Sequence, residues 1–207
     1  MPDHPHRPPL LALALALLLC LLAGCSTRPA RVPAPRINPA AIVDAVFEKA
    51  DADRDGRLPA SEQQTVPSIA AAAGRLDGDG DGAVTREELL AWLEAVHDSR
   101  VAITSLEVIV TQRGRPLAAV TVRLVPEPFM GNELKAAEGV TDAGGVAAVT
   151  IPDATYPGVN CGLYRVEIIG TGNDGKPLPE RVNTATTLGV AVGAGIPETG
   201  SVEFRLD

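Results

Sequence analysis

The sequence predicts an α+β protein in which helices and strands occupy separate domains. A helical domain is expected at residues 38–98 and a Greek-key β-sandwich at residues 103–207. Within the first segment, apolar residues recur at the helical spacing i, i+3, i+4, i+7. From about residue 103 they alternate with polar residues, as in half-buried strands. Two short acidic segments that contain glycine interrupt the helical pattern.

The composition narrows the possible functions. Of the 207 residues, 45% are hydrophobic and 21% are charged, which is typical of a globular protein. Aromatic residues make up only 3%, and the net charge is −8. Both values argue against nucleic-acid binding, which relies on basic surfaces and aromatic stacking. We therefore expect no nucleic-acid partner.

The first residues are predicted to be a signal peptide. Residues 10–22 are an unbroken run of Leu and Ala with one Cys. As a helix this run would be roughly 20 Å long, too short for the ~30 Å hydrocarbon core of a bilayer. The run ends in Leu22-Ala23-Gly24-Cys25, which resembles the lipobox of bacterial lipoproteins. The resemblance implies a signal peptide at residues 1–24, lipidation of Cys25, and a cell-envelope location; Ser26 suggests the outer membrane.

Residues 25–37 are expected to form a Pro-rich tether. The segment contains three prolines and three arginines and no acidic residue. Proline-rich chains are extended, at ~3.1 Å per residue. The positive charge would suit a position near anionic headgroups, and a purely solvated spacer fits equally well.

Two twelve-residue segments, residues 51–62 and 77–88, have the spacing of calcium-binding loops. Calcium takes 6–8 oxygen ligands, from side chains at loop positions 1, 3 and 5, a carbonyl at 7 and a bidentate Glu at 12, with Gly at 6 for the turn. The predicted ligands in loop one are Asp51, Asp53, Asp55, the carbonyl of Arg57, and Glu62. Those in loop two are Asp77, Asp79, Asp81, the carbonyl of Ala83, Thr85 through a water, and Glu88. Pro59 occupies position 9 of loop one, as Thr85 does in loop two, and it has no side-chain oxygen. Loop one is therefore expected to bind calcium more weakly than loop two.

The segments around these loops support this interpretation. Four apolar residues precede each loop at matching offsets, and further ones follow loop two: Val43, Val46, Phe47 and Ala50; Ile69, Ala72, Ala73 and Leu76; Leu89, Trp92, Leu93 and Val96. Asn38 and Ser68 are predicted helix caps, and Leu58 and Val84 a β-bridge between the loops. The segment resembles the paired EF-hands of the calmodulin superfamily. The loop starts are only 26 residues apart and Pro67 lies between them, so the second helix is predicted to be short.

The C-terminal half shows the alternation of strands around residues 106–111, 120–124, 164–168 and 202–206, with others at 146–151 and 188–192. Turn residues separate them. The segments 114–122, 139–145 and 162–168 resemble carboxypeptidase regulatory-like domains, which have a transthyretin-like fold. The resemblance implies a fold related to Ig-like sandwiches and leaves the function open. Cys161, Trp92 and Tyr164 are expected to be core residues.

These observations predict a lipid-anchored, calcium-binding protein whose sandwich is a spacer or a protein-interaction module. The alternative is a carbohydrate-binding surface module with structural calcium, which would need an exposed strip of aromatic residues. The candidates for that strip are Phe129, Tyr156, Tyr164 and Phe204. No enzymatic activity is expected, because His97 is the only histidine after the signal peptide and no nucleophile or phosphate-binding motif is present.

Overall fold

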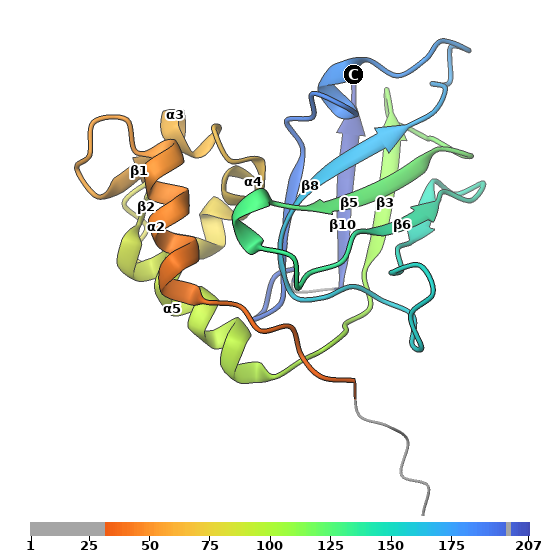
Figure 1. Cartoon of the computed structure of the whole chain (residues 1–207). Coiled ribbons are helices and arrows are strands. Elements are labelled where there is room, and N and C mark those ends of the chain that lie inside the picture. Colours follow the sequence, from red (N-terminus) through yellow and green to blue (C-terminus); the bar gives the residue numbers. More distant parts are fainter. Residues whose placement is uncertain (1–31, 198–199) are drawn as a thin grey trace, which may run out of the picture. The chain divides into compact units, whose positions relative to one another are not determined.

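The computed structural model describes residues 32–197 and 200–207. Residues Val32–Asp207 form one compact unit, with helices and strands in separate parts of it (Figure 1). The predicted signal peptide (residues 1–24), the predicted lipidation site Cys25 and the first part of the tether (residues 25–31) lie outside the described residues. Those assignments therefore stay predictions.

The N-terminal part of the unit is helical, as predicted. Its elements are α2 (Pro39–Ala50), β1 (Arg57–Pro59), α3 (Ala60–Gln63), α4 (Pro67–Leu76), β2 (Ala83–Thr85) and α5 (Arg86–Ser99). The apolar stripes predicted for these helices are buried, except that Ala73 is only partly covered. The second helix, α3, has just four residues, which agrees with the short connection between the loops.

The starts of α2 and α4 both follow from local sequence, but not both from the predicted caps. The side chain of Asn38 accepts a hydrogen bond from the amide of Ala41 at 3.2 Å, so the predicted cap of α2 is confirmed. The predicted cap Ser68 is wrong. Helix α4 begins at Pro67, whose fixed φ suits the first helical position, and Val66 precedes it. Ser68 therefore lies inside the first turn, fully buried.

The C-terminal part consists of two β-sheets. Its elements are β3 (Glu107–Gln112), β4 (Arg115–Pro116), β5 (Thr121–Pro126), the 3₁₀ turn η1 (Pro128–Met130), β6 (Ala137–Val140), β7 (Val146–Ala148), β8 (Gly162–Ile169), the 3₁₀ turn η2 (Glu180–Val182), β9 (Gly189–Val192) and β10 (Ser201–Leu206). One sheet has the order β6-β5-β8-β9, and the other is β10-β3-β4 with β7 also paired to β3. Most pairs are antiparallel, but β10 runs parallel to β3.

The pairing requires the chain to cross between the sheets. Strand β5 pairs along its whole length with β8, and β3 pairs with β10, although both partners are distant in sequence. The chain thus passes between two sheets, but the parallel β3–β10 pair departs from the antiparallel Greek key that the sequence predicts. The strands β4 and β6 are hard to recognise in the sequence. Strand β4 has only two residues, and β6 has four, one of which is Gly139.

One hydrophobic cluster extends through both parts. It includes Val46 and Leu93 of the helices and Tyr164 and Ile168 of the sheet, all of which are fully buried. Trp92, Tyr164 and Cys161 are buried, as predicted, and Cys161 is a free thiol. The two predicted domains therefore share packing, and the boundary between residues 98 and 103 stays a prediction.

Candidate metal centre

Loop one follows α2 directly and is folded around the carboxylate of Asp51. The Asp51 amide donates to the carbonyl of Phe47 at 3.0 Å and so completes the last turn of the helix. Its Oδ1 accepts from the amide of Asp55 at 3.2 Å, and its Oδ2 accepts from that of Gly56 at 3.0 Å. Gly56 has a φ of +82°, a left-handed conformation that side chains rarely adopt. The glycine thus allows the turn that wraps the loop around Asp51.

Loop two has the same internal geometry. Oδ1 of Asp77 accepts from the amides of Gly80 at 2.7 Å and Asp81 at 3.1 Å, and its Oδ2 accepts from Gly82 at 2.9 Å. Gly82 again has a positive φ, of +88°. The Asp77 amide donates to Ala73 at 2.8 Å, so the first loop residue also ends α4.

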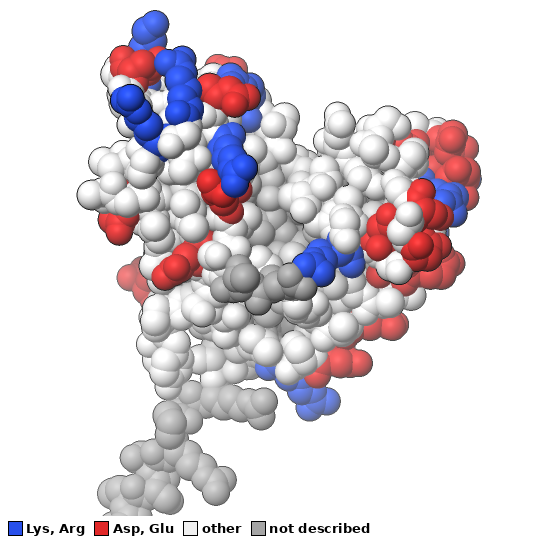
Figure 2. Space-filling view, turned by 180° about the vertical axis from the view of Figure 1, so that it is seen from behind, with Lys and Arg blue, Asp and Glu red and all other residues white. Residues whose placement is uncertain are grey.

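Three aspartates converge in each loop. One carboxylate oxygen from each lies within 4.8 Å of the other two, in the triads Asp51, Asp53 and Asp55, and Asp77, Asp79 and Asp81. Acidic side chains cluster on the side of the molecule that carries the loops (Figure 2). Like charges at this separation repel, and a divalent cation among them would remove the repulsion.

Glu62 completes the donor set of loop one. Its Oε1 accepts from the amide of Ala52 at 2.8 Å. Its Oε2 is buried and has no hydrogen-bond partner. A buried carboxylate oxygen without a partner is costly, unless a cation is bound to it. This oxygen therefore fits the role of a metal ligand at position 12.

Glu88 holds the same place in loop two, where it also caps α5. Its Oε1 accepts from the amide of Gly78, and its Oε2 from the amide and hydroxyl of Thr85, each at 2.8 Å. Thr85 accepts in return from the Glu88 amide at 3.3 Å, which makes a capping box. Burial raises the pKa of Glu88, but the donors from Thr85 and Gly78 outweigh it and lower the pKa overall. The hydroxyl predicted to hold a water thus also orients the Glu88 carboxylate.

A short β-bridge joins the loops and positions their carbonyl donors. Leu58 pairs with Val84, as predicted, and both side chains are fully buried. Arg57 and Ala83, whose carbonyls are the predicted ligands, lie at opposite ends of this pairing. The bridge therefore fixes the two loops beside each other.

The side chain of Arg57 has a role that the sequence did not indicate. Its guanidinium forms an exposed ion pair with Asp81 of the other loop. This hydrogen bond, followed by the charge of Asp81, raises the pKa of Arg57. The pKa of Asp81 is lowered, first by Arg57 and then by the amide of Ala83. Position 7 of loop one thus places a positive charge on a predicted ligand of loop two.

Gln63 is a second residue whose role the sequence did not indicate. Its side-chain amide is buried and donates to the carbonyls of Leu58 at 2.8 Å and Gly82 at 3.4 Å. It therefore connects the two loops behind the metal sites. In the sequence, only its position directly after Glu62 indicated that it lies near the metal site.

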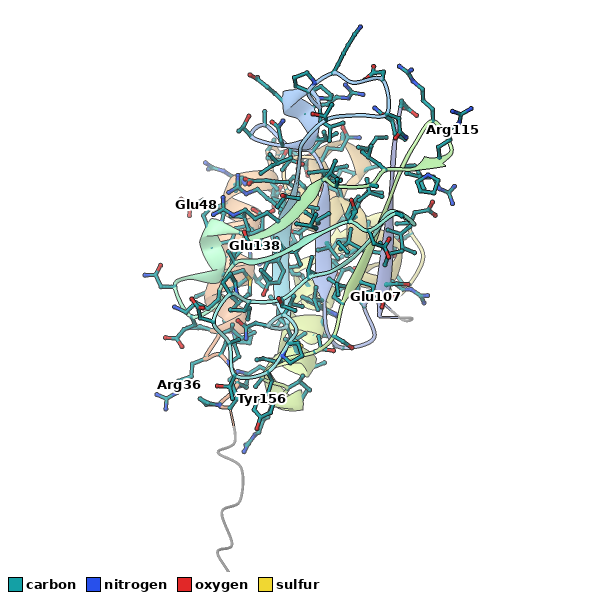
Figure 3. All side chains as sticks on the ribbon, turned by 90° about the vertical axis from the view of Figure 1, so that its right-hand side faces the viewer. Arg36, Glu48, Glu107, Arg115, Glu138 and Tyr156 are labelled. Carbon is teal, nitrogen blue, oxygen red and sulfur yellow. The ribbon has the colours of Figure 1, made fainter. Side chains whose placement is uncertain are left out.

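The candidate aromatic strip is not assembled on the surface. Tyr164 and Phe204 are buried, and the hydroxyl of Tyr164 donates to the Asn160 carbonyl at 2.9 Å. Phe129 is partly buried, whereas Tyr156 is 43% exposed. Figure 3 shows Tyr156 at the same end of the unit as Arg36.

Among the described residues, none of the helices combines the length and apolar character that a membrane span requires.

Comparison with known proteins supports the assignment of the loops. The EF hand family model matches the chain at residues 42–62 and 74–93. Each match contains residues of an entering helix and the aspartate triad of the following loop. No curated protein and no solved structure matches the chain. The chain thus combines an EF-hand region at its helical end with a β-rich C-terminal region.

Proposed function

We propose that this protein binds two calcium ions, one in each EF-hand loop. The observation that carries the proposal is the aspartate triad in each loop, joined in loop one by the Oε2 of Glu62, a buried carboxylate oxygen without a partner. The donor set consists of carboxylate and carbonyl oxygens, which suit a hard cation. The ligands would be the residues predicted from the sequence, with Arg57 and Ala83 contributing their carbonyls. When bound, calcium would neutralise the acidic loops and hold them in their folded shape.

Isothermal titration calorimetry on the full chain tests this proposal. The wild type should bind two calcium ions, and Asp51→Ala and Asp77→Ala should each remove one. Asp98→Ala is a matched control, because Asp98 is an exposed aspartate on α5 outside both loops. Absence of calcium uptake by the wild type, or equal uptake by all variants, would contradict the proposal.

We assign the calcium a structural rather than a signalling role. Sensor EF-hands expose a methionine-rich groove when calcium binds. Met130 is the one methionine of the described residues; it lies in η1, outside the EF-hand region, and is buried. Extracytoplasmic calcium sites commonly have dissociation constants of about 10⁻⁴–10⁻³ M, which suits permanent occupancy where calcium is abundant.

The proposed location is the cell envelope, through a lipid on Cys25, with the outer membrane as the expected site. The support is the lipobox-like sequence Leu22-Ala23-Gly24-Cys25 and the tether that follows it. Expression in a bacterial host with a labelled fatty acid should give a labelled, membrane-associated protein. Cys25→Ser should abolish both properties. Cys161→Ser, the control, should leave them unchanged, because Cys161 is buried in the sandwich region.

For the sandwich we propose a role as a spacer or a protein-interaction module, and no enzymatic reaction. Pull-down experiments with and without calcium would identify a protein partner. The alternative, glycan binding, is favoured by one observation: a cleft of about 610 Å³ has polar residues such as Glu133, Asp153 and Asn160 in a mostly apolar lining, which includes Thr155, the residue before Tyr156. Glycan binding that is lost in Tyr156→Ala but retained in Phe129→Ala would favour this alternative.

A further inference from the structure

Helix α4 links the second loop to the β-sheet. Its last residue, Leu76, is followed by Asp77, the first predicted ligand of loop two. Its opposite end is buried: Val66, Ser68 and Ile69 are each 0% exposed. A helix of ten residues is too short to be stable by itself in water, where about 12–15 residues are marginal. The stability of α4 therefore depends on what holds its two ends.

Strand β9 holds the N-terminal end. A Cβ atom on Gly189 would lie 2.2 Å from the carbonyl carbon of Pro67 and 2.3 Å from the amide nitrogen of Ser68, so the two backbones are in direct contact. All four residues of β9 are buried, although alternation would leave one face in solvent. The face that would otherwise be exposed is thus covered by α4.

A buried polar contact fixes this arrangement. The hydroxyl of Ser68 donates to Oε1 of Glu127 at 3.1 Å. The Glu127 side chain is 0% exposed, and its Oε2 lies 4.0 Å from Nε of Arg165 on β8, an ion-pair separation at which neither atom has a hydrogen-bond partner among the described residues. A buried carboxylate is costly unless it is paired and hydrogen-bonded. The Ser68 hydroxyl thus satisfies one oxygen of a buried carboxylate that directly follows β5, and this contact holds α4 against the end of that strand.

We propose that the β8–β9 face of the sandwich is the resident partner of the EF-hand pair, and that its contact with α4 is coupled to calcium binding in loop two. The inference rests on the proposed calcium function. Calcium would hold Asp77 and thereby the last turn of α4, which favours the docked helix. By thermodynamic reciprocity, the docked sheet strengthens calcium binding by the same factor. The face of α4 that packs on β9 is thus already covered from within the chain.

The test compares two glycine variants of the full chain. Gly189→Ala would force Pro67 and Ser68 away from β9. Gly139→Ala is the matched control. Gly139 lies in β6, at the opposite edge of the same sheet from β9, and its Cβ would also meet backbone, 2.5 Å from the Ala148 carbonyl oxygen. Both variants carry Asp51→Ala, so that calorimetry reports loop two alone. Hydrogen–deuterium exchange then measures the protection of β8 and β9 with and without calcium.

We expect Gly189→Ala to weaken calcium binding in loop two by at least about fivefold, the lower end of typical coupling between sites. Gly139→Ala should bind as its parent does. Calcium should slow exchange in β9 of the parent. Ser68→Ala, which removes only the hydroxyl and leaves the backbone contact with β9 in place, should shift the affinity in the same direction as Gly189→Ala.

Two results would overturn the inference alone: equal calcium affinity in the Gly189→Ala and Gly139→Ala variants, or calcium binding that leaves exchange in β9 unchanged. A parent protein that takes up no calcium would instead remove the proposed function and this inference together.

Discussion

At the scale of single residues, Arg57 serves both loops at once. Its carbonyl is a predicted ligand of loop one, while its guanidinium pairs with Asp81 of loop two. A cation so close to the donor atoms competes with calcium for Asp81 and repels the incoming ion. Because the pair is exposed, this effect should be modest and should decrease with salt.

Arg57→Gln should therefore raise the calcium affinity of loop two by a factor of about two to five at low ionic strength, the size expected of an exposed ion pair. Arg113→Gln, on the hairpin between β3 and β4, makes the same change in net charge far from the loops in sequence and should have little effect. Calorimetry at two salt concentrations measures both. An affinity for calcium that falls in Arg57→Gln would show that the side chain supports the site instead.

The two position-12 glutamates should respond differently to neutralisation. Oε2 of Glu62 has no hydrogen-bond partner, whereas both oxygens of Glu88 accept hydrogen bonds that also cap α5. Glu62→Gln should lower calcium affinity by about tenfold or more and leave the melting temperature without calcium nearly unchanged. Glu88→Gln should lower both quantities, because it also weakens the cap.

Titration calorimetry and thermal denaturation in a chelator separate the two effects. Equal losses of calcium-free stability in both variants would mean that Glu62 is as firmly hydrogen-bonded as Glu88.

At the scale of elements, the shortest helix has a specific use. Helix α3 is a single turn, and its last residue, Gln63, spans from the Leu58 carbonyl to that of Gly82. A longer helix would carry the chain away from loop two. The closeness of the loops in sequence is thus matched by a side chain that joins them in space.

Gln63→Ala should lower the free energy of unfolding by about 1 kcal/mol, the usual net value of one buried hydrogen bond, and should reduce cooperativity between the two calcium sites. Gln64→Ala is the neighbouring control, because Gln64 is exposed. Chemical denaturation and calcium titration measure the two outcomes. Unchanged stability in Gln63→Ala would indicate that water replaces the amide.

The elements also show which features the sequence could predict. Three features follow from the spacing of residues close together in the chain, which a single sequence shows directly. They are the apolar face of α2, the Leu58–Val84 bridge and the two acidic loops. The start of α4 was readable locally from Pro67, a residue suited to the first helical position, but the partner of Ser68, Glu127, lies 59 positions away. The side-chain partner of Arg57 and the parallel pairing of β10 likewise depend on contacts between distant segments. No local pattern encodes them.

At the scale of the whole unit, helices and sheets share one hydrophobic cluster, and α4 connects the metal loops to that cluster. The free energy of calcium binding at the loops should therefore stabilise the helical part and the sheets against unfolding together. A protein of this arrangement is expected to unfold in one step.

Calcium should accordingly raise the melting temperature of a single transition. A site at a calcium concentration 100 times its dissociation constant contributes about 2.7 kcal/mol. For a chain of this size, each kcal/mol shifts the midpoint by roughly 2–4 °C, so one occupied site should add about 5–10 °C. Differential scanning calorimetry with calcium, with magnesium and with chelator provides the measurement. Two separate transitions, of which calcium moves only one, would contradict the expectation.

The burial of Trp92 in α5 gives the molecule a convenient optical property. It is the sole tryptophan of the chain, and both tyrosines, Tyr156 and Tyr164, belong to the β-rich C-terminal region. Indole emission therefore reports on the surroundings of α5, and the phenol bands of the absorbance spectrum report on the C-terminal region. Recording the two signals during one thermal denaturation reveals, without any attached dye, whether both parts of the molecule unfold at the same temperature.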